Sequence, residues 1–399
     1  MSTIIRETFE KNEGIFRLIP SFVPRALSTP GGRLRLHPDD LYAFGMERGA
    51  IKVRYFSSVI HSFGGPDAAP DEGMSYVSYS NDPKDRFLLK DAIDELGAQI
   101  IGKELWDKYG TWPMHSKFFD FGGPMFHHLH LDFAAAARVG QLGKPEGYYF
   151  PIQYNSHPGE FPHTFFGFAP DVTREQVRQR VEMFLKGDNR LTELSRAFRL
   201  QLGTGWYTPP GVLHAPGSYL TYEPQWNSAV SSVFENVTNG AINSYATLVS
   251  DCPEDKKYDV DYIMSLLDWE KNVDPDYRKH YFRPPVPARQ EDTFDEKWIM
   301  YGNGYIAAKE LTVYPGQTAV VKDGAAYGCI FIQGHGKFGG YDAETAGLLR
   351  FGGLSADEYF VSQQAAQKGV VIQNQSAFEP IVMLKHFGPN HPDEPKMSE

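Results

Sequence analysis

The chain has 399 residues, enough for two substantial hydrophobic cores, so we expect at least two domains. Its 39 Lys and Arg against 50 Asp and Glu give a formal net charge of -11, and without a basic run this argues against a nucleic-acid partner. No segment reaches the roughly 18 to 20 apolar residues that cross a bilayer, so we expect a cytoplasmic protein with no membrane partner. Because there are only 2 cysteines, any metal must be held by nitrogen and oxygen atoms.

The first part of the chain reads as short strands broken by Gly and Pro, as in residues 51–66 and 73–83. Apolar residues at helical spacing then predict a helical region at 90–110, which glycines interrupt. Strand patterns continue to about residue 250, with one helical insertion at 173–187. The first 250 residues therefore predict antiparallel β structure with a helical excursion.

The composition changes after residue 250. Residues 251–290 are charged, then helical, then rich in proline, which is typical of a connector. A second strand-rich block follows at 291–390, and residues 391–399 form a polar tail. We therefore predict an all-β-dominated protein with domains at 1–250 and 291–390.

Three histidines stand close together in PMFHHLHLDF. In an extended strand, residues two apart share a face, so His128 and His130 project together while His127 points the other way. Such a pair can belong to a metal site, or it can consist of core histidines with satisfied hydrogen bonds. The pair by itself does not decide between these interpretations.

Two further candidate ligands follow along the chain. Glu146 lies in QLGKPEGYYF just before an aromatic strand, and His214 ends the turn TPPGVLH. Nitrogen and carboxylate ligands from separate strands, with one position left vacant, form the usual open site of a catalytic divalent metal. Taken alone, Glu146 could be a solvated turn carboxylate and His214 could be bonded to its own turn.

Several motifs occur in an order that is specific as a set, namely LIPSFVPRAL, GTWPMHSKFFDF, HLHLD, GKPEGYYF, TFFGFAPDVTREQV, GTGWYTPPGVLHAPG and YLTYEPQWNS. Through them, roughly the first 250 residues resemble the type I mannose-6-phosphate isomerases of the cupin superfamily. The resemblance implies two cupin barrels (double-stranded β-helix, or jelly-roll, folds), with a helical insertion and a helical connector. It leaves a homodimer open.

The resemblance also implies a ligand set for one divalent metal ion. The family's Gln-x-His pair matches His128 and His130, with histidine in the place of glutamine. Its Lys-Pro-Glu motif matches Glu146, and its Pro-x-Gly-x-x-His turn matches His214. Zinc is the metal that the resemblance favours, and manganese, nickel and iron are compatible with the same ligands.

The activity implied by the resemblance is aldose–ketose isomerisation of a sugar or sugar phosphate through a cis-enediol. The family's candidate base matches Glu223, and Lys144 is placed to bond to sugar or phosphate oxygens. An exposed strand carboxylate and a solvated turn lysine are the alternative interpretations of these two residues.

One position departs from the family. Ten residues after the candidate base the family has an arginine, and the matching residue here is Val233. Arg278, Lys279 and Arg283 in the connector are the candidates to replace it. The departure leaves open whether the substrate is phosphorylated.

Two other classes of function fit the same residues, namely a bicupin metal-dependent oxygenase and a sugar-binding bicupin without catalysis. The second strand-rich block has only His335, between two glycines, and the late His386. Because neither has further ligands at the spacing of the first site, we expect no metal in that half, and we expect a turn rather than a strand at His335.

Overall fold

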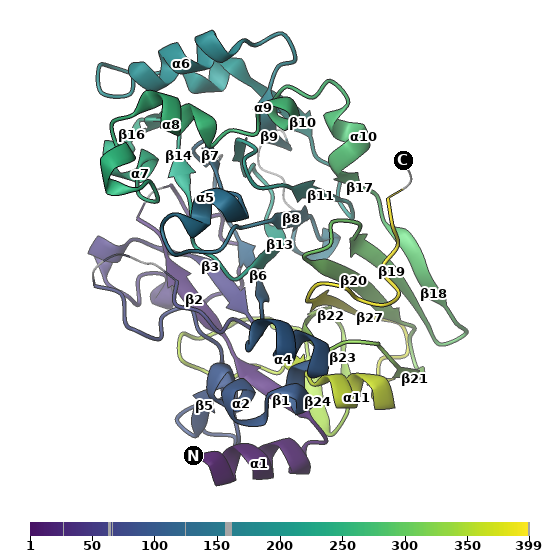
Figure 1. Ribbon diagram of the computed structural model, residues 1–399. Coiled ribbons are helices and arrows are strands. Elements are labelled where there is room, and N and C mark those ends of the chain that lie inside the picture. Colours follow the sequence, from purple (N-terminus) through teal and green to yellow (C-terminus); the bar gives the residue numbers. More distant parts are fainter. Residues whose placement is uncertain (27, 63–64, 66, 124, 156–161, 398–399) are drawn as a thin grey trace.

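The computed structural model describes residues 1–399 except 27, 63–64, 66, 124, 156–161 and 398–399. Within these residues most strands belong to four antiparallel sheets (Figure 1). The five-stranded sheet has the order β10-β9-β12-β7-β14, with β7 (His128–Leu129), β9 (His163–Phe168), β10 (Ser195–Arg199), β12 (His214–Ala215) and β14 (Ser232–Val233). The seven-stranded sheet has the order β17-β11-β8-β13-β6-β3-β2, with β2 (Ser21–Pro24), β3 (Ile51–Phe56), β6 (Met114–Phe119), β8 (Glu146–Tyr149), β11 (Gly205–Thr208), β13 (Thr221–Trp226) and β17 (Phe282–Arg283).

The C-terminal part of the described chain supplies most of the other two sheets. The nine-stranded sheet has the order β18-β19-β20-β27-β22-β25-β1-β4-β5, with β1 (Ile15–Ile19), β4 (Tyr76–Ser78), β5 (Arg86–Leu88), β18 (Val286–Gln290), β19 (Phe294–Met300), β20 (Ala307–Val313), β22 (Tyr327–Gln333), β25 (Glu358–Val361) and β27 (Ile381–Phe387). The four-stranded sheet has the order β21-β26-β23-β24, with β21 (Thr318–Val321), β23 (His335–Phe338), β24 (Tyr341–Glu344) and β26 (Val370–Asn374). A separate hairpin joins β15 (Val237–Thr238) to β16 (Ala241–Ile242).

Helices lie mainly at the two ends of the molecule (Figure 1). The α-helices are α1 (Ser2–Lys11), α2 (Leu89–Leu96), α3 (Ala98–Ile101), α4 (Lys103–Tyr109), α5 (Phe133–Ala137), α6 (Arg174–Glu182), α7 (Tyr245–Leu248), α8 (Val260–Ser265), α9 (Trp269–Asn272), α10 (Tyr277–Tyr281) and α11 (Gln363–Lys368). The helical region predicted at 90–110 is confirmed as α2, α3 and α4, which Gly97 (φ 47°) and Gly102 (φ 87°) separate. Helices α1 and α11 were not predicted from the sequence.

Hydrophobic clusters between successive sheets show how the sheets stack. One cluster joins Phe166 of the five-stranded sheet to Phe119 of the seven-stranded sheet. A second joins Met114 of the seven-stranded sheet to Leu384 of the nine-stranded sheet. A third joins the nine-stranded sheet to the four-stranded sheet, for example through Phe338. The sheets therefore form layers in the order five, seven, nine and four strands, and the predicted β-rich, antiparallel character of the fold is confirmed.

The middle position of the seven-stranded sheet explains why β6 is buried along almost its whole length. Met114 and Phe118 face the nine-stranded sheet, whereas Phe119 faces the five-stranded sheet. Because side chains alternate along a strand, His115 and Lys117 point to the same side as Phe119. The sheet thus directs polar side chains into the space between itself and the five-stranded sheet.

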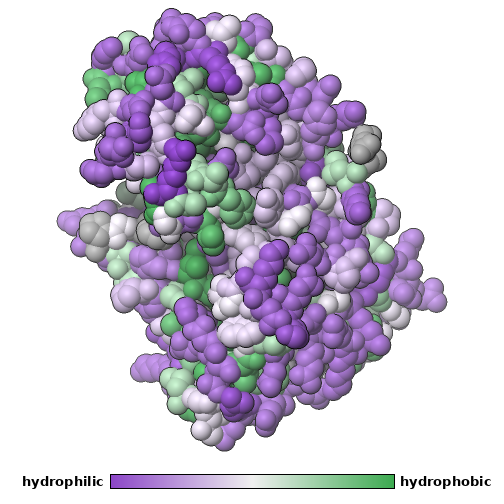
Figure 2. Space-filling model, viewed as in Figure 1, coloured by the Kyte–Doolittle hydropathy of each residue, from purple (hydrophilic) through white to green (hydrophobic). Residues whose placement is uncertain are grey.

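A further cluster covers the opposite face of the five-stranded sheet. It joins Leu129 and Phe168 of that sheet to Val177 of α6 and Ile263 of α8, which lie together at one end of the molecule (Figure 1). The face shown in Figure 2 is mostly hydrophilic, with one group of hydrophobic residues near α5 and smaller groups toward both ends of the molecule. Among the described helices, none combines the length and the apolar composition that a membrane span needs.

A buried charge group fastens the seven-stranded sheet to the nine-stranded sheet. Arg54 of β3 donates to both carboxylate oxygens of Asp357 at 2.8 Å and to Glu358 at 3.1 Å. These three side chains are at most 1% exposed. Burial and the neighbouring Asp357 raise the pKa of Glu358 to about 8, although Arg54 acts in the opposite direction.

This raised pKa predicts a dependence of stability on pH. Between its ordinary pKa of 4.5 and about 8, Glu358 holds a proton in the folded state that the unfolded chain has released, so its contribution to stability falls as pH rises through this window. The slope of unfolding free energy against pH measures the difference in bound protons between the folded and unfolded states. Glu358→Gln should reduce this difference by about one proton, as measured by urea unfolding across that range. The exposed Glu344→Gln is the control, and an unchanged slope in Glu358→Gln would contradict the assignment.

Candidate metal centre

Strands β7 and β12 bring three histidines together. His128 and His214 are directly paired across the two antiparallel strands. Leu129 and Leu131 pack outward under the helices, so alternation directs His128 and His130 inward, toward the seven-stranded sheet. The ring centroids of His128 and His214 are 4.3 Å apart, and each lies 5.1 Å from that of His130. The predicted pair thus becomes a buried group of three imidazoles, whose ligand atoms lie within 4.8 Å of one another.

Backbone carbonyls fix the orientation of all three rings. The Nδ1–H of His128 donates to Phe126 at 3.0 Å, that of His130 to Val230 at 2.7 Å, and that of His214 to Val212 at 2.8 Å. A carbonyl oxygen can only accept, so the neutral form of each ring carries its proton on Nδ1 and has the lone pair on Nε2. Such a second hydrogen bond is the usual partner of a metal-ligating histidine.

Glu146 reaches the histidines from the opposite sheet. Its Oε2 lies 2.9 Å from His130 Nε2, and its Oε1 lies 3.1 Å from His214 Nε2. Tyr148 donates its hydroxyl proton to Oε1 at 3.0 Å. Burial by itself would raise the pKa of Glu146, but His130 and Lys144 outweigh it and hold that pKa well below its ordinary value. The carboxylate is therefore ionised beside the imidazoles.

The protonation state of the histidines suits the same role. Burial, together with the nearby His214 and His130, holds the pKa of His128 well below its ordinary value. Burial also lowers the pKa of His130 to about 4, against the pull of Glu146. Neutral imidazoles and an ionised carboxylate are the forms that coordinate metal ions.

The geometry leaves polar atoms that a cation would satisfy. His214 Nε2 and Glu146 Oε2 are buried and lack a hydrogen bond of acceptable geometry. Lys144 Nζ lies 2.9 Å from His130 Nε2 and 3.1 Å from Glu146 Oε2, so the lysine ammonium places a positive charge beside these two candidate ligands. Three imidazole nitrogens and one carboxylate match the donors of an open zinc, manganese or iron site. The residues present therefore fit a divalent metal.

The ammonium group of Lys144 lies against two of the candidate metal ligands. Its predicted bond to sugar or phosphate oxygens stays a prediction. Lys144 is also buried rather than solvated. The sequence did not predict this burial. Lys144 lies in a loop two residues before Glu146, and the direction of a loop side chain depends on the strands that pack against it.

Glu223 is buried on the inward face of β13. Its Oε1 lies 2.7 Å from Lys117 Nζ of the neighbouring strand β6. Burial and the charge of Glu146 raise the pKa of Glu223 to about 8, while Lys117 and Lys144 oppose the shift. The alternative of an exposed strand carboxylate is therefore wrong.

Lys117, like its neighbour His115, was missed as a site residue. The nitrogens of His115 contact Asn227 Oδ1 at 2.6 Å and Gln225 Nε2 at 2.9 Å, and burial lowers the pKa of His115 to about 3. The signal was present in MHSKFF, where three consecutive polar residues stand inside an otherwise apolar strand. A run of polar residues in a strand that is almost completely buried indicates a functional interior.

Other predicted residues lie beside the centre or away from it. His127 bonds through Nδ1 to Glu235 at 2.8 Å and is not part of the histidine group. Val233 is buried and pairs with His128 across β14 and β7, so the departure from the family lies next to a candidate ligand. Arg283 is engaged by the carbonyl oxygens of Tyr301 and His280, each at 2.8 Å.

The two histidines of the second block take different positions. His335 begins strand β23 and is exposed, so the expectation of a turn there is wrong. His386 is buried on β27, where its Nδ1 lies 2.8 Å from both Ser116 Oγ and Tyr222 Oη. In the described part of the chain, neither belongs to a group of candidate metal ligands.

No family model and no curated protein sequence matches the chain. Solved structures do. The mannose 6-phosphate isomerase from Bacillus subtilis aligns with a TM-score of 0.60 and 17% identity, over 94% of this chain and 99% of that one. A putative mannosephosphate isomerase from Archaeoglobus fulgidus gives 0.60 and 14%, over 94% and 97%. A mutant of phosphomannose isomerase from Salmonella typhimurium gives 0.63 and 10%, over 94% and 100%. The resemblance noted in the sequence is thus confirmed at the level of fold, and the chain has the cupin-like fold of these phosphomannose isomerases.

Proposed function

We propose that the protein is a metal-dependent aldose–ketose isomerase that acts on a sugar or sugar phosphate. The observation that carries this proposal is the convergence of His128, His130, His214 and Glu146, with the Lys117–Glu223 pair on the adjacent strands. The fold shared with mannose 6-phosphate isomerases supports it. We assign zinc as the metal, with manganese, nickel and iron as the alternatives that elemental analysis would distinguish.

The proposal includes an arrangement of two cupin barrels. The five- and seven-stranded sheets, with the metal centre between them, would form the first, and the nine- and four-stranded sheets the second. The division of the chain into domains at 1–250 and 291–390, joined by a connector at 251–290, remains part of this proposal. In the structure β1 pairs with β25, so the N-terminal strand contributes to the sheet of the C-terminal block.

Glu223 is the group that we assign to proton transfer. As a carboxylate it would take the proton from the carbon next to the sugar carbonyl, giving a cis-enediolate, and would return it to the former carbonyl carbon. The hydroxyl proton would move from its oxygen to the former carbonyl oxygen through the cis-enediol, so that one carbonyl and one hydroxyl exchange places. Lys117, at 2.7 Å, would hold the carboxylate in place and favour its charged form. When bound at the histidines and Glu146, a divalent metal would supply positive charge to stabilise the enediolate oxygen.

Glu223→Gln tests this assignment. The variant keeps the size of the side chain but cannot accept the proton, so turnover should fall by about 100-fold or more while metal content stays at the wild-type level. The matched control is Glu358→Gln, a buried carboxyl in the nine-stranded sheet, which should retain turnover. Undiminished turnover in Glu223→Gln would move the role to another group, with Lys144 as the next candidate.

The function itself is tested by assaying a panel of aldoses, ketoses and their phosphates with metal-loaded and chelator-treated protein. Metal-dependent isomerisation is the expected result. Oxygen uptake would identify an oxygenase, and tight sugar binding without turnover would identify a binding protein. Either outcome would replace the proposed activity.

A further inference from the structure

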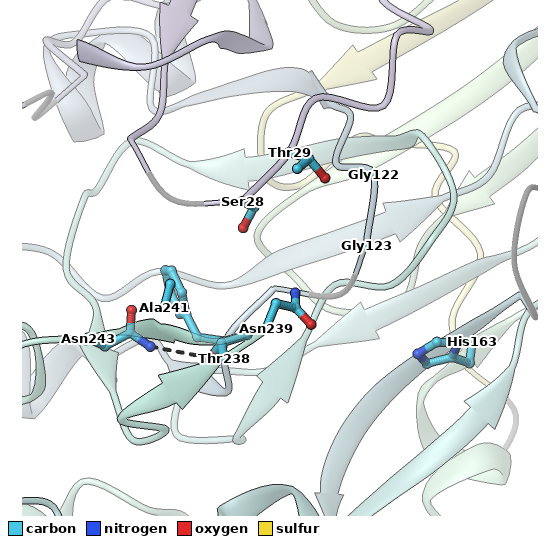
Figure 3. A pocket seen from close by; sticks show the side chains of 10 residues that line it. Ser28, Thr29, Gly122, Gly123, His163, Thr238, Asn239, Ala241 and Asn243 are labelled. Atoms are coloured by element: carbon cyan, nitrogen blue, oxygen red, sulfur yellow. Dashed lines mark hydrogen bonds between the residues drawn. The ribbon is translucent and has the colours of Figure 1, made fainter. Parts of the chain in front are cut away.

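A cavity of about 640 Å³ is lined by Phe126, two residues before the candidate ligand His128. Six polar residues line it, from segments far apart in the sequence (Figure 3): Ser28, Thr29, His163, Thr238, Asn239 and Asn243. Two glycines, Gly122 and Gly123, form part of its wall. Hydroxyls and side-chain amides therefore dominate its polar surface.

The cavity is joined to the metal centre through the strands that carry the ligands. Phe126 lines it, lies 5.4 Å from the ring of His128 between centroids, and accepts the Nδ1–H of that histidine. His163 begins β9, which pairs with β12 at His214. The hairpin of β15 and β16 follows β14, whose Val233 pairs with His128. The cavity thus lies against the segments that lead into or out of the strands carrying His128 and His214.

The charges around the cavity do not suit a phosphate group. Among the described residues that line it, none is Lys, Arg, Asp or Glu. The two lysines of the metal centre are already paired, Lys117 with Glu223 and Lys144 with Glu146. Arg33 donates to Asp120 and to the carbonyl oxygens of Phe121 and Ser218. A phosphate dianion is usually held by charge-assisted bonds from Arg or Lys, whereas sugar hydroxyls bond well to neutral donors and acceptors.

We propose that this cavity binds the hydroxyl-bearing end of a free monosaccharide, so that the substrate of the metal centre is a non-phosphorylated aldose or ketose. This inference rests on the proposed isomerase function. A sugar extends from its carbonyl, held at the metal centre, through successive hydroxyls into the cavity. The buried Val233 beside His128 adds no charge on that path.

The test compares a hexose with its 6-phosphate, using the metal-loaded full chain. Isomerisation should show a kcat/KM at least about tenfold higher for the free hexose, and calorimetry should show tighter binding of it than of the ester. Preferred turnover of the ester would overturn this inference and leave the isomerase assignment standing. Binding of the free hexose without turnover of either would overturn the isomerase assignment and, with it, the assignment of a free sugar as substrate. Binding of neither would overturn the inference.

Two isosteric variants test the cavity directly. Thr29→Val and Thr238→Val each remove one lining hydroxyl, and each should raise KM for the free hexose by about threefold to tenfold with kcat and metal content unchanged. Thr318→Val, at an exposed position of β21, is the matched control and should leave KM unaltered. Wild-type KM in both cavity variants, with native thermal unfolding, would show that the sugar binds elsewhere.

Discussion

Replacing His130 or His214 with alanine is expected to strip the metal from the protein and to abolish turnover. Each ring would supply one Nε2 to the metal, and each is oriented by a hydrogen bond from its Nδ1 to the backbone carbonyl of Val230 or Val212. Loss of an outer hydrogen-bond partner typically weakens metal binding 10- to 100-fold, and loss of the ligand itself should cost more. Elemental analysis of the purified variants should therefore find far less than the one equivalent per chain expected of the wild type.

His127→Ala is the matched control for this experiment. His127 is next to His128 in sequence and also buried, but its ring bonds to Glu235 and lies 4.9 Å from the ring of Phe165 between centroids. It should keep a full equivalent of metal. Full occupancy in both His130→Ala and His214→Ala would contradict the ligand assignment. A reproducible second equivalent, lost on replacing His335 or His386, would contradict a single centre.

The histidine pair could be predicted because it depends on local geometry. Strand alternation alone places His128 and His130 on one face, and the structure directs them inward. The joining of His214 and Glu146 to that pair came from the order of motifs rather than from periodicity. Their proximity depends on β12 pairing with β7, and on the Glu146 side chain reaching His214 from β8 of the facing sheet, which no local pattern specifies.

Residues whose role depends on tertiary pairing were the ones missed. Lys117 becomes a site residue because β6 pairs with β13 in the register that sets it opposite Glu223. The N-terminal strand β1 was read as part of the first half, but its Ile15 pairs with Val361 of β25. The polar tail likewise contains His391, which is buried and packs 4.6 Å from the ring of Phe387. The composition of a segment does not predict its burial, because burial depends on which other parts of the chain pack against it.

The interior between the nine- and four-stranded sheets contains a group of ion pairs that was not predicted from the sequence. Lys385 of β27 forms ion pairs with Glu296 of β19 and, at 2.7 Å, with Asp323. Lys309 of β20 reaches Asp323 at 2.6 Å, and Arg289 reaches Glu296 at 2.6 Å. The lysines and carboxylates of this group are almost completely buried. Burial would raise the pKa of Asp323, but Lys385 and the other partners outweigh it and lower that pKa strongly.

Lys385→Met is expected to destabilise the protein by about 3 to 5 kcal/mol, because it leaves two buried carboxylates without their shared cation. Methionine matches the length and apolar stem of lysine, so the loss reports the charge rather than a cavity. Urea unfolding of the full chain would measure it. The control is Lys337→Met, whose ion pair with Asp342 is exposed, so its loss should cost less than about 1 kcal/mol. A Lys385→Met variant as stable as this control would mean that Lys309 and Arg289 neutralise both carboxylates on their own. Because Lys385 lies in a different layer from the histidines, metal content per folded chain should remain at the wild-type level, which separates the stability of this interior from the chemistry of the metal centre.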